Sequence, residues 1–207
     1  MRLIRSDACV AEGTDWLAAR VPEFDHALRL TGPLPLRLRP DGFGQLLSAI
    51  VSQQVSTASA AAIWDRVQRA GLVSPDAIRA ASDADLAGVG LSRPKIRYFR
   101  ALAEAGIDFN ALRDVPGEEV IATLTSVTGI GRWTAEIYTM FSLGHADAFA
   151  AGDLALQESA RTLFSLEARP SDRALREMAE PWRPWRSVAA RILWAWYRVE
   201  KGREGLR

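Results

Sequence analysis

The sequence predicts an all-α protein, and three observations lead to this fold class. Apolar residues recur with a helical period in most segments, whereas sustained alternation of apolar and polar residues, which is typical of β-strands, is scarce. Serine and proline stand before several of these segments, as at Ser74-Pro75 and Ser92-Arg93-Pro94, where they favour helix starts. With 207 residues, 48% of them hydrophobic, the chain can form one domain or two small lobes with a buried core.

The predicted helices follow one another along the whole chain. We expect the first to be capped by Thr14 and to run to about Leu30. The proline-containing segment 31–40 then interrupts the pattern, because proline fixes φ and lacks a backbone donor. Further helices are expected over residues 43–55, 57–70, 75–80, 83–87, 93–105, 118–125, 132–142, 154–164, 172–179 and 185–200.

The composition excludes several classes of protein. A formal net charge of +1 disfavours a protein that binds a polyanion through bulk positive charge. Cys9 is the only cysteine, so one chain can form neither a disulfide framework nor an iron–sulfur site, and the distant His26 and His145 give no support for zinc. No apolar run reaches about 18 residues and no signal-peptide pattern is present. We therefore expect a soluble, intracellular (cytoplasmic) protein that does not associate with membranes.

Residues 127–135 form the most informative motif. Gly129 and Gly131 flank Ile130 between two helical segments, and glycine permits the tight turn that such a pair makes. The turn leaves the first N–H groups of the next helix directed outward, which is typical of an anion site. No β-strand precedes the glycines, so they are not a dinucleotide-binding fingerprint. The motif predicts a helix-hairpin-helix over about 118–142 that clamps a nucleic-acid phosphate through Gly129, Gly131, Arg132 and Thr134, and the alternative is an ordinary glycine-capped turn between helices.

Further motifs occur in a fixed order around the hairpin, at residues 43–56, 90–97, 149–154 and 180–187. Over roughly residues 20–200 the chain resembles the helix-hairpin-helix (HhH-GPD) DNA glycosylases of base excision repair, in the DNA-3-methyladenine glycosylase II branch. The endonuclease III branch is disfavoured, because it usually carries a four-cysteine iron–sulfur site.

The resemblance implies a fold of two helical lobes with the active site in the cleft between them. One lobe would span residues 40–145 and contain the hairpin, and the other would combine residues 1–39 with 146–207. Full-length bacterial members carry a further N-terminal β domain, for which some 40 residues leave no room. We therefore expect the compact form.

Asp153 is the candidate catalytic residue. It lies where the essential aspartate of the resembling family begins the helix after the hairpin. A fixed carboxylate there would stabilise the positive charge that develops on deoxyribose when the N-glycosidic bond breaks, and it could orient or deprotonate water. Gly152-Asp153 before Leu154 is also an ordinary helix N-cap, and the two roles are compatible. Gly152 stands where the branch often has a second acidic residue, and Asp147 is the alternative nearby carboxylate.

Aromatic residues predict the pocket for an extruded base. Trp133 stands where bifunctional relatives carry a Schiff-base lysine, so the resemblance implies a monofunctional enzyme that leaves an intact abasic site; its alternative role is helix packing. Trp194 matches the tryptophan that stacks on the base in the family, and Tyr138 is a further lining candidate. At most two members of the C-terminal aromatic cluster are expected in the pocket, and the rest in the core. The cluster comprises Trp182, Trp185, Trp194, Trp196 and Tyr197.

Two segments are candidates for DNA contact beyond the hairpin. In the family, the stretch that ends at Gln53-Gln54 faces the minor groove, and the residue at or near Gln54 fills the gap left by the flipped nucleotide. Arg93, Lys95 and Arg97 surround a predicted helix start and could reach phosphates. The alternatives are an exposed pair of amides and a solvated basic face.

No organic cofactor is expected. The hairpin carbonyls of this family hold a monovalent cation that bridges to a DNA phosphate. By resemblance alone, the matching carbonyls here are those near Thr125, Val127 and Ile130.

The resemblance therefore implies a monomeric, monofunctional glycosylase that removes alkylated purines, such as 3-methyladenine and 7-methylguanine, from double-stranded DNA. Cationic purines rank first among the expected substrates because alkylation already makes them good leaving groups. The sequence offers no clear residue to act as an acid for a neutral leaving base. One alternative is a helix-hairpin-helix protein that binds lesions without cleaving them. Another is a glycosylase for deaminated, oxidised or mismatched bases.

Overall fold

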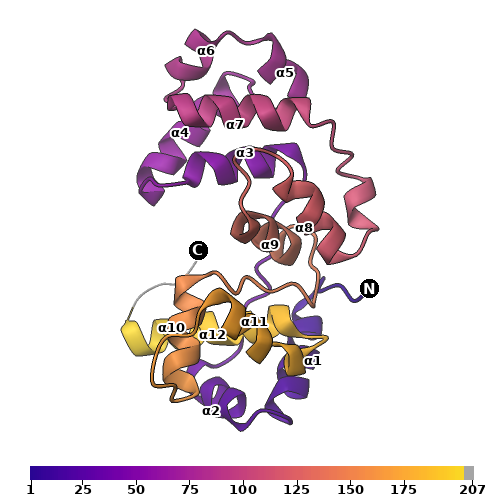
Figure 1. Cartoon of the computed structure of the whole chain (residues 1–207), viewed down its shortest axis with the longest axis vertical. Coiled ribbons are helices and arrows are strands. Elements are labelled where there is room, and N and C mark those ends of the chain that lie inside the picture. The colour runs from indigo at the N-terminus through magenta and orange to yellow at the C-terminus, as the bar shows by residue number, and fades with distance from the viewer. Residues whose placement is uncertain (203–207) are drawn as a thin grey trace. The chain divides into compact units, whose positions relative to one another are not determined.

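The computed structural model describes residues 1–202, and within this range the protein is helical without a β-strand (Figure 1). The only extended pairing there is an isolated antiparallel bridge between Leu3 and His145. The elements are α1 (Asp7–Ala18), α2 (Pro22–Thr31), α3 (Phe43–Ser52), α4 (Thr57–Arg69), α5 (Pro75–Ala80), α6 (Asp83–Gly88), α7 (Arg93–Glu104), η1 (Ala111–Arg113), α8 (Gly117–Thr125), α9 (Arg132–Phe141), α10 (Leu154–Leu163), α11 (Asp172–Met178), η2 (Glu180–Trp182) and α12 (Arg186–Lys201).

The all-α prediction is confirmed, and the helices from α3 onward match their predicted ranges closely. The prediction of one helix from Thr14 to Leu30 is wrong. Ser6 caps α1 by accepting from the Cys9 N–H, and Thr14 lies inside that helix with its hydroxyl donating to the Ala11 carbonyl. Pro22, which cannot donate a backbone hydrogen bond, opens the separate helix α2.

The chain folds into two compact units. The central unit is Pro40–Tyr138, and the terminal unit joins Met1–Arg39 to the chain from Thr139 onward. The sequence places the second boundary after residue 145, whereas the structure places it within α9. Residues after Tyr138 belong with the N-terminal segment because Ile4 N–H donates to the Gly144 carbonyl (2.7 Å) and Arg39 N–H to the Phe141 carbonyl (2.9 Å).

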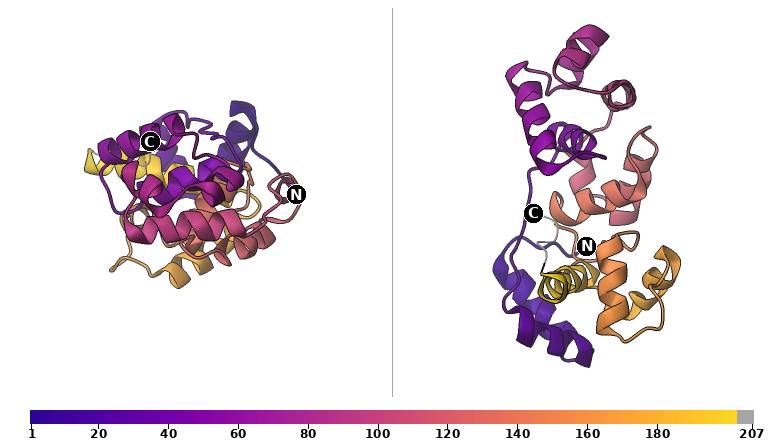
Figure 2. Two further views of the ribbon diagram at one scale, coloured as in Figure 1. Left: turned by 90° about the horizontal axis from the view of Figure 1, so that it is seen from above. Right: turned by 90° about the vertical axis from the view of Figure 1, so that its left-hand side faces the viewer.

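The terminal unit is built around α12, which packs against α10, α2 and α1. In the right-hand view of Figure 2, α12 (yellow) is seen nearly along its axis, with orange α10 on one side and the indigo N-terminal helices on the other. Trp182 adds an aromatic cluster at this core, because its ring stacks on Phe164 (5.8 Å between centres) and meets the edge of Phe24 (4.9 Å). This packing anchors the end of α10, where Phe164 is the C-cap, in the core of the terminal unit.

In the central unit, α7 packs against α3, α5 and α6, and α3 also packs against α4 (Figure 1). Leu46, Leu47 and Ile50 of α3 and Phe99 of α7 are fully buried and form this core. The packing places the end of α3 and the start of α7 beside the turn between α8 and α9. Within residues 1–202, no helix combines the length and the apolar character needed to cross a bilayer.

Candidate active site

Asp153 is the N-cap of α10 and is held by several donors. Its Oδ1 accepts from the N–H groups of Ala155 (2.9 Å) and Leu156 (3.1 Å), and from Trp194 Nε1 (3.2 Å). The residue is only 8% exposed. A carboxylate fixed in this way at the positive end of a helix keeps its charge in one place without needing to reorganise.

The loop that leads to Asp153 is also fixed within the terminal unit. Buried Gln157 donates from Nε2 to the Ala151 carbonyl at 2.9 Å. Asp147, the alternative catalytic carboxylate, forms ion pairs with Arg183 and with Arg186, of which Arg186 is buried. These pairs give Asp147 a structural role at the start of the loop.

The loop also accounts for the glycine that precedes Asp153. A Cβ atom at Gly152 would come within 3.0 Å of Asp172 Oδ2, and Asp172 is itself paired with Arg176. A second acidic side chain at this position would therefore meet the carboxylate of Asp172, at the start of α11.

Trp194 is placed differently from its expected role as a stacking platform. It is 1% exposed, its ring lies 5.6 Å from that of Phe141, and its indole N–H donates to Asp153. An indole covered on both faces has no surface left for a base, so in this structure Trp194 orients the carboxylate instead.

Tyr138 also differs from its expected position in a base pocket. It is 3% exposed, and its hydroxyl oxygen accepts a hydrogen bond from the Gly42 N–H at 2.7 Å. Burial raises the pKa of Tyr138 to about 12. The side chain therefore closes the core of the central unit at the start of α3.

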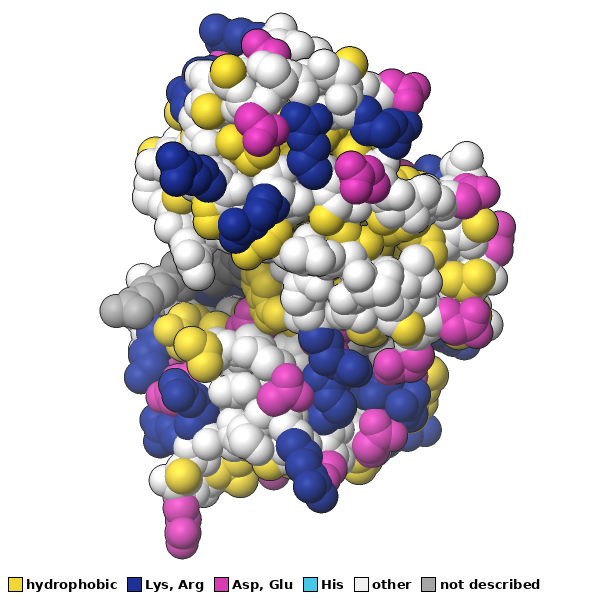
Figure 3. Space-filling view, turned by 45° about the horizontal axis from the view of Figure 1, so that its top comes forward, with side chains coloured by type: hydrophobic (Ala, Val, Ile, Leu, Met, Phe, Trp, Pro, Cys, Tyr) yellow, Lys and Arg dark blue, Asp and Glu magenta, His cyan; other side chains and the backbone are white. Residues whose placement is uncertain are grey.

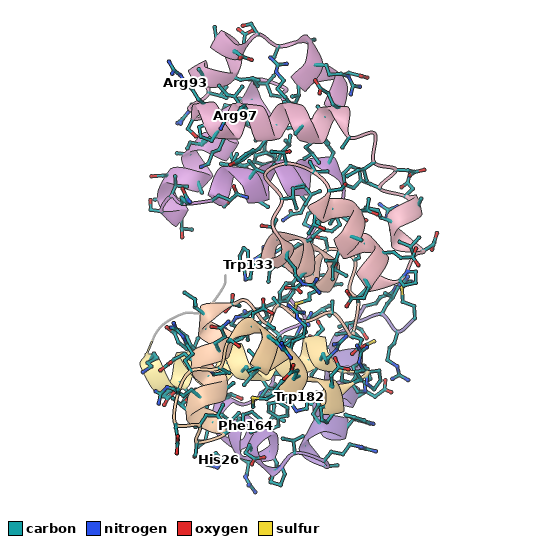
Figure 4. All side chains as sticks on the ribbon, in the orientation of Figure 1. His26, Arg93, Arg97, Trp133, Phe164 and Trp182 are labelled. Carbon is teal, nitrogen blue, oxygen red and sulfur yellow. The ribbon has the colours of Figure 1, made fainter. Side chains whose placement is uncertain are left out.

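Trp133, in the first turn of α9, is 40% exposed and is labelled in Figure 4. It is the one predicted pocket aromatic that keeps a substantial accessible surface. Most of the C-terminal aromatic cluster lies in the core, as expected: Trp182 and Trp185 are buried, and half-buried Trp196 donates to the Thr162 hydroxyl at 2.9 Å.

The turn of the predicted hairpin depends on Gly129. Its φ is +96°, and a Cβ atom there would lie 2.2 Å from Cγ of Tyr98 on α7. Gln53, at the end of α3, donates from Nε2 to the Gly129 carbonyl at 2.9 Å. At Gly131, by contrast, a Cβ atom would meet nothing within 4 Å. Gly129 is thus required by packing, whereas the space beside Gly131 is open.

Lys95 does not lie where a phosphate contact would need it. It is 8% exposed, and its ammonium donates to the Val51 carbonyl in the last turn of α3 at 2.7 Å. Burial lowers the pKa of Lys95. The lysine therefore ties α7 to the end of α3. It is Arg93 and Arg97, one helical turn apart on α7, that are exposed (Figure 4).

Of the remaining predicted DNA contacts, some side chains are exposed and others are buried or paired within the protein. Gln54 is exposed with φ +56°, a conformation that costs free energy for a residue other than glycine. Thr134 is buried, and Arg132 donates to buried Glu136 (2.8 Å) and lies 3.6 Å from Glu118. The Arg132 side chain is thus paired with carboxylates. We therefore expect the backbone N–H groups of the hairpin, rather than this side chain, to contact an anion.

The expected cation site involves the same turn. Thr125 is the last residue of α8, and the Val127 carbonyl accepts from the Ile130 N–H at 3.0 Å. A carbonyl has two lone pairs, and the negative end of a helix dipole favours a cation. The donor set of Thr125, Val127 and Ile130 is therefore compatible with a monovalent ion.

Comparison with known proteins agrees with this arrangement. The family model described as "HhH-GPD superfamily base excision DNA repair protein" matches residues 47–184, well over half of the chain. The chain belongs to the HhH-GPD superfamily. The match includes the end of α3, the hairpin and Asp153, whereas Trp194 lies beyond its end.

Individual HhH-GPD relatives cover most of the chain. DNA-3-methyladenine glycosylase 1 of Schizosaccharomyces pombe is 30% identical, over 75% of this chain and 72% of its own. The solved structure of DNA-3-methyladenine glycosidase from Bacillus halodurans is 32% identical with a TM-score of 0.80, covering 96% and 93% of the two chains. A 3-methyladenine DNA glycosylase of S. pombe, solved in complex with abasic DNA, has 26% identity and a TM-score of 0.75, covering 95% and 100%.

The structure also reveals residues of the site that sequence reasoning missed. Tyr98 shapes the hairpin by packing on Gly129, and Gln157 braces the loop before Asp153. Neither carries a local signal, because a tyrosine on a helix and a glutamine in a first turn occur in many contexts. Their roles follow only from what they contact.

Proposed function

We propose that the protein is a monofunctional DNA glycosylase, which hydrolyses the N-glycosidic bond of alkylated purines in double-stranded DNA and leaves an abasic site. The observation that carries this proposal is the Asp153 carboxylate, fixed at the start of α10 by two backbone N–H groups and an indole N–H. Membership of the HhH-GPD superfamily and relatives named DNA-3-methyladenine glycosylases support it.

The proposed chemistry needs a fixed negative charge beside the sugar. As the C–N bond breaks, its electron pair leaves with the base and positive charge develops on the deoxyribose. Asp153 stabilises that charge and orients the water, whose hydroxyl joins the sugar while its proton is released. A cationic 3-methyladenine or 7-methylguanine leaves as a neutral base and needs no separate acid. This is the reason to expect alkylated purines as substrates.

The absence of a lyase step follows from the lysines of the chain. There are two, Lys95 and Lys201. Lys95 donates to a backbone carbonyl of α3, and Lys201 ends α12 with its ammonium 3.8 Å from Glu158. Trp133, at the start of α9, cannot form a Schiff base. The expected product is therefore an intact abasic site.

We expect the DNA to be held by few contacts rather than by bulk charge. Figure 3 shows Lys and Arg side chains interspersed with acidic and apolar ones on the face in view, in keeping with a net charge of +1. Backbone N–H groups at the start of α9 are suited to one phosphate, and a monovalent cation on the Thr125, Val127 and Ile130 carbonyls would add a second link to it. Trp133 is the proposed contact for the extruded base.

The test uses DNA treated with a simple methylating agent, from which liberated bases are separated by chromatography. We expect release of methylated purines, and strand breaks only after hot alkali. Breaks without alkali would contradict the monofunctional assignment. Binding to lesion-containing duplex without release of any base would favour the alternative of a lesion-binding protein.

Replacing Trp194 by phenylalanine is expected to slow base release by roughly tenfold to a hundredfold, because a hydrogen bond to a charged group contributes about 1.5–3 kcal/mol. Single-turnover kinetics would measure the effect. Trp185→Phe is the matched control, because Trp185 is about as buried as Trp194 and packs against Arg2, which lies over its ring. If both variants slow the reaction equally, lost packing rather than the hydrogen bond to Asp153 is responsible.

Arg93→Gln is expected to weaken DNA binding. The negative slope of log K against log salt should become shallower by about 0.9, the value for one lost phosphate contact. Lys95→Met should leave the slope unchanged, because its ammonium is bound to the Val51 carbonyl. Fluorescence anisotropy over a salt series would measure both. A smaller slope for Lys95→Met alone would contradict these assignments.

A further inference from the structure

The exposed end of α3 is attached to the hairpin turn by one side chain of the central unit. Gln53 is the C-cap of α3, and its Nε2 donates to the Gly129 carbonyl in the turn between α8 and α9 at 2.9 Å. The next two residues, Gln54 and Val55, are exposed. Because they follow Gln53 in the chain, they lie beside the turn whose N–H groups are the proposed contact for a phosphate.

Helix α7 holds both of these segments. Lys95, in its first turn, is 8% exposed and donates to the Val51 carbonyl near the end of α3 at 2.7 Å. Tyr98 lies three residues later, on the same side of α7, and packs on Gly129, where a Cβ atom would come within 2.2 Å of its Cγ. Together with the hydrogen bond of Gln53, these contacts form a closed triangle that joins α7, the end of α3 and the hairpin turn.

The position of Lys95 is unfavourable for α7 and favourable for α3. Its charge is buried against a neutral carbonyl, and burial lowers its pKa. The first turn of a helix also disfavours a cation, because the positive end of the helix dipole lies there. The last carbonyls of a helix, by contrast, lack partners within that helix, and the dipole at this end favours a cation. Lys95 therefore stabilises the end of α3 at the expense of its own helix.

The chain directly beyond these contacts is strained. Gln54 has φ +56°, which is unfavourable for a residue other than glycine. Such a conformation persists only where the surrounding structure overdetermines it. Lys95 fixes Val51 and the hairpin turn fixes Gln53, so the residues that lead to Gln54 are held from two sides. The exposed amide of Gln54 and the apolar side chain of Val55, which is 38% exposed, thus follow a fixed base.

We propose that Lys95, Tyr98 and Gln53 are positioning residues, which fix Gln54 and Val55 beside the hairpin turn in the arrangement that binds DNA opened at a damaged nucleotide. An amide can hydrogen-bond the edge of an unpaired base, and an apolar side chain can enter between unstacked bases. The three contacts then set the preference for an opened duplex over an intact one. This inference rests on the proposed action on DNA, and it concerns residues that act through their neighbours.

The test compares the affinity for a duplex that contains a tetrahydrofuran abasic analogue with the affinity for the intact duplex, by fluorescence anisotropy. Wild type is expected to prefer the opened duplex. Lys95→Met and Gln53→Met each remove a donor at nearly constant volume. The preference should fall about tenfold or more for Lys95→Met and about threefold to tenfold for Gln53→Met, because a hydrogen bond from a charged group is the stronger one.

A spectroscopic measurement separates positioning from affinity. A 2-aminopurine base next to the analogue becomes brighter when it is unstacked. At saturating protein, wild type should increase its fluorescence, and the two methionine variants should increase it less. Lys95→Arg keeps a cationic donor and should restore at least part of the preference and of the fluorescence gain.

Two control variants separate positioning from stability and from the phenol group. Phe99→Leu alters a fully buried residue of α7, so it should lower the melting temperature and keep the preference. Tyr98→Phe keeps the ring atoms nearest Gly129 and should behave as wild type, whereas Tyr98→Ala should lose the preference. All binding is measured below the melting temperature of the least stable variant.

The inference would be overturned if Lys95→Met and Gln53→Met kept the wild-type preference and fluorescence gain, or if Phe99→Leu lost them to the same extent. Equal affinity of wild type for the two duplexes would overturn it as well. The base-release assay separates the two proposals. Base release by wild type with an unchanged preference in the variants refutes the positioning role alone. Loss of the preference in the variants, when wild type releases no base, refutes the glycosylase and keeps the positioning role.

Discussion

Asp153→Asn is expected to lower the single-turnover rate of base release by about 10²–10³ or more, while the fold is kept. Asparagine is as good an N-cap as aspartate, so its side-chain oxygen can still accept from the Ala155 and Leu156 N–H groups. Trp194 can still donate to the same oxygen. The substitution therefore removes the charge that faces the developing oxocarbenium ion in the proposed mechanism while these hydrogen bonds can be kept, and a rate measured with enzyme in excess reports that loss directly.

Asp172→Asn is the matched control, because Asp172 supplies another carboxylate of the terminal unit, close to Gly152. Surface substitutions change free energies by about 0.5 kcal/mol or less, so its rate should stay within about a factor of two to three of wild type. Thermal melting should show that Asp153→Asn remains folded. If this folded variant released bases at the wild-type rate, Asp153 would be only a helix cap and another group would stabilise the transition state.

Gly129→Ala is expected to destabilise the protein by about 2–5 kcal/mol, which is the sum of the costs of a left-handed backbone and of overpacking. Its φ is +96°, and the new methyl group would lie 2.2 Å from the Tyr98 ring. For a chain of this length the melting temperature should fall by at least about 4 °C. DNA affinity should fall as well, because the turn between α8 and α9 has to shift.

Gly131→Ala provides the control within the same motif. Its Cβ would meet no atom within 4 Å, and so the melting temperature should be unchanged or slightly higher. If the DNA backbone approaches the start of α9 closely, this variant should nevertheless bind DNA more weakly than wild type. Equal melting temperatures for the two alanine variants would contradict the packing role assigned to Gly129.

The sequence predicted the features that depend on neighbouring residues. Ser74 caps α5 by accepting from the Ala77 N–H, and Asp153 caps α10, both at the predicted starts. The glycine turn of the hairpin lies between the expected helices. The error at Thr14 has a local cause too, since Pro22 was a stronger break than the apolar pattern across it suggested.

Side-chain roles that depend on distant residues could not be predicted in this way. Lys95 looked like a phosphate contact but donates to Val51, 44 positions earlier in the chain. Tyr138 looked like a pocket residue but accepts from Gly42, and Trp194 donates to Asp153 instead of presenting a face to a base. The contact of Arg191 with the Leu36 carbonyl gave no signal at all, because 155 positions separate the two residues.

The sequence by itself thus determined the helices, the hairpin and the position of the aspartate, together with the family to which the chain belongs. Caps, turns and helical periodicity act over a few residues, and their physical causes are present in any short stretch of chain. The tertiary structure alone decided which side chains are buried, which charges are paired and which surfaces stay open. Burial and pairing depend on the elements that pack against a side chain, and those elements come from positions far away in sequence.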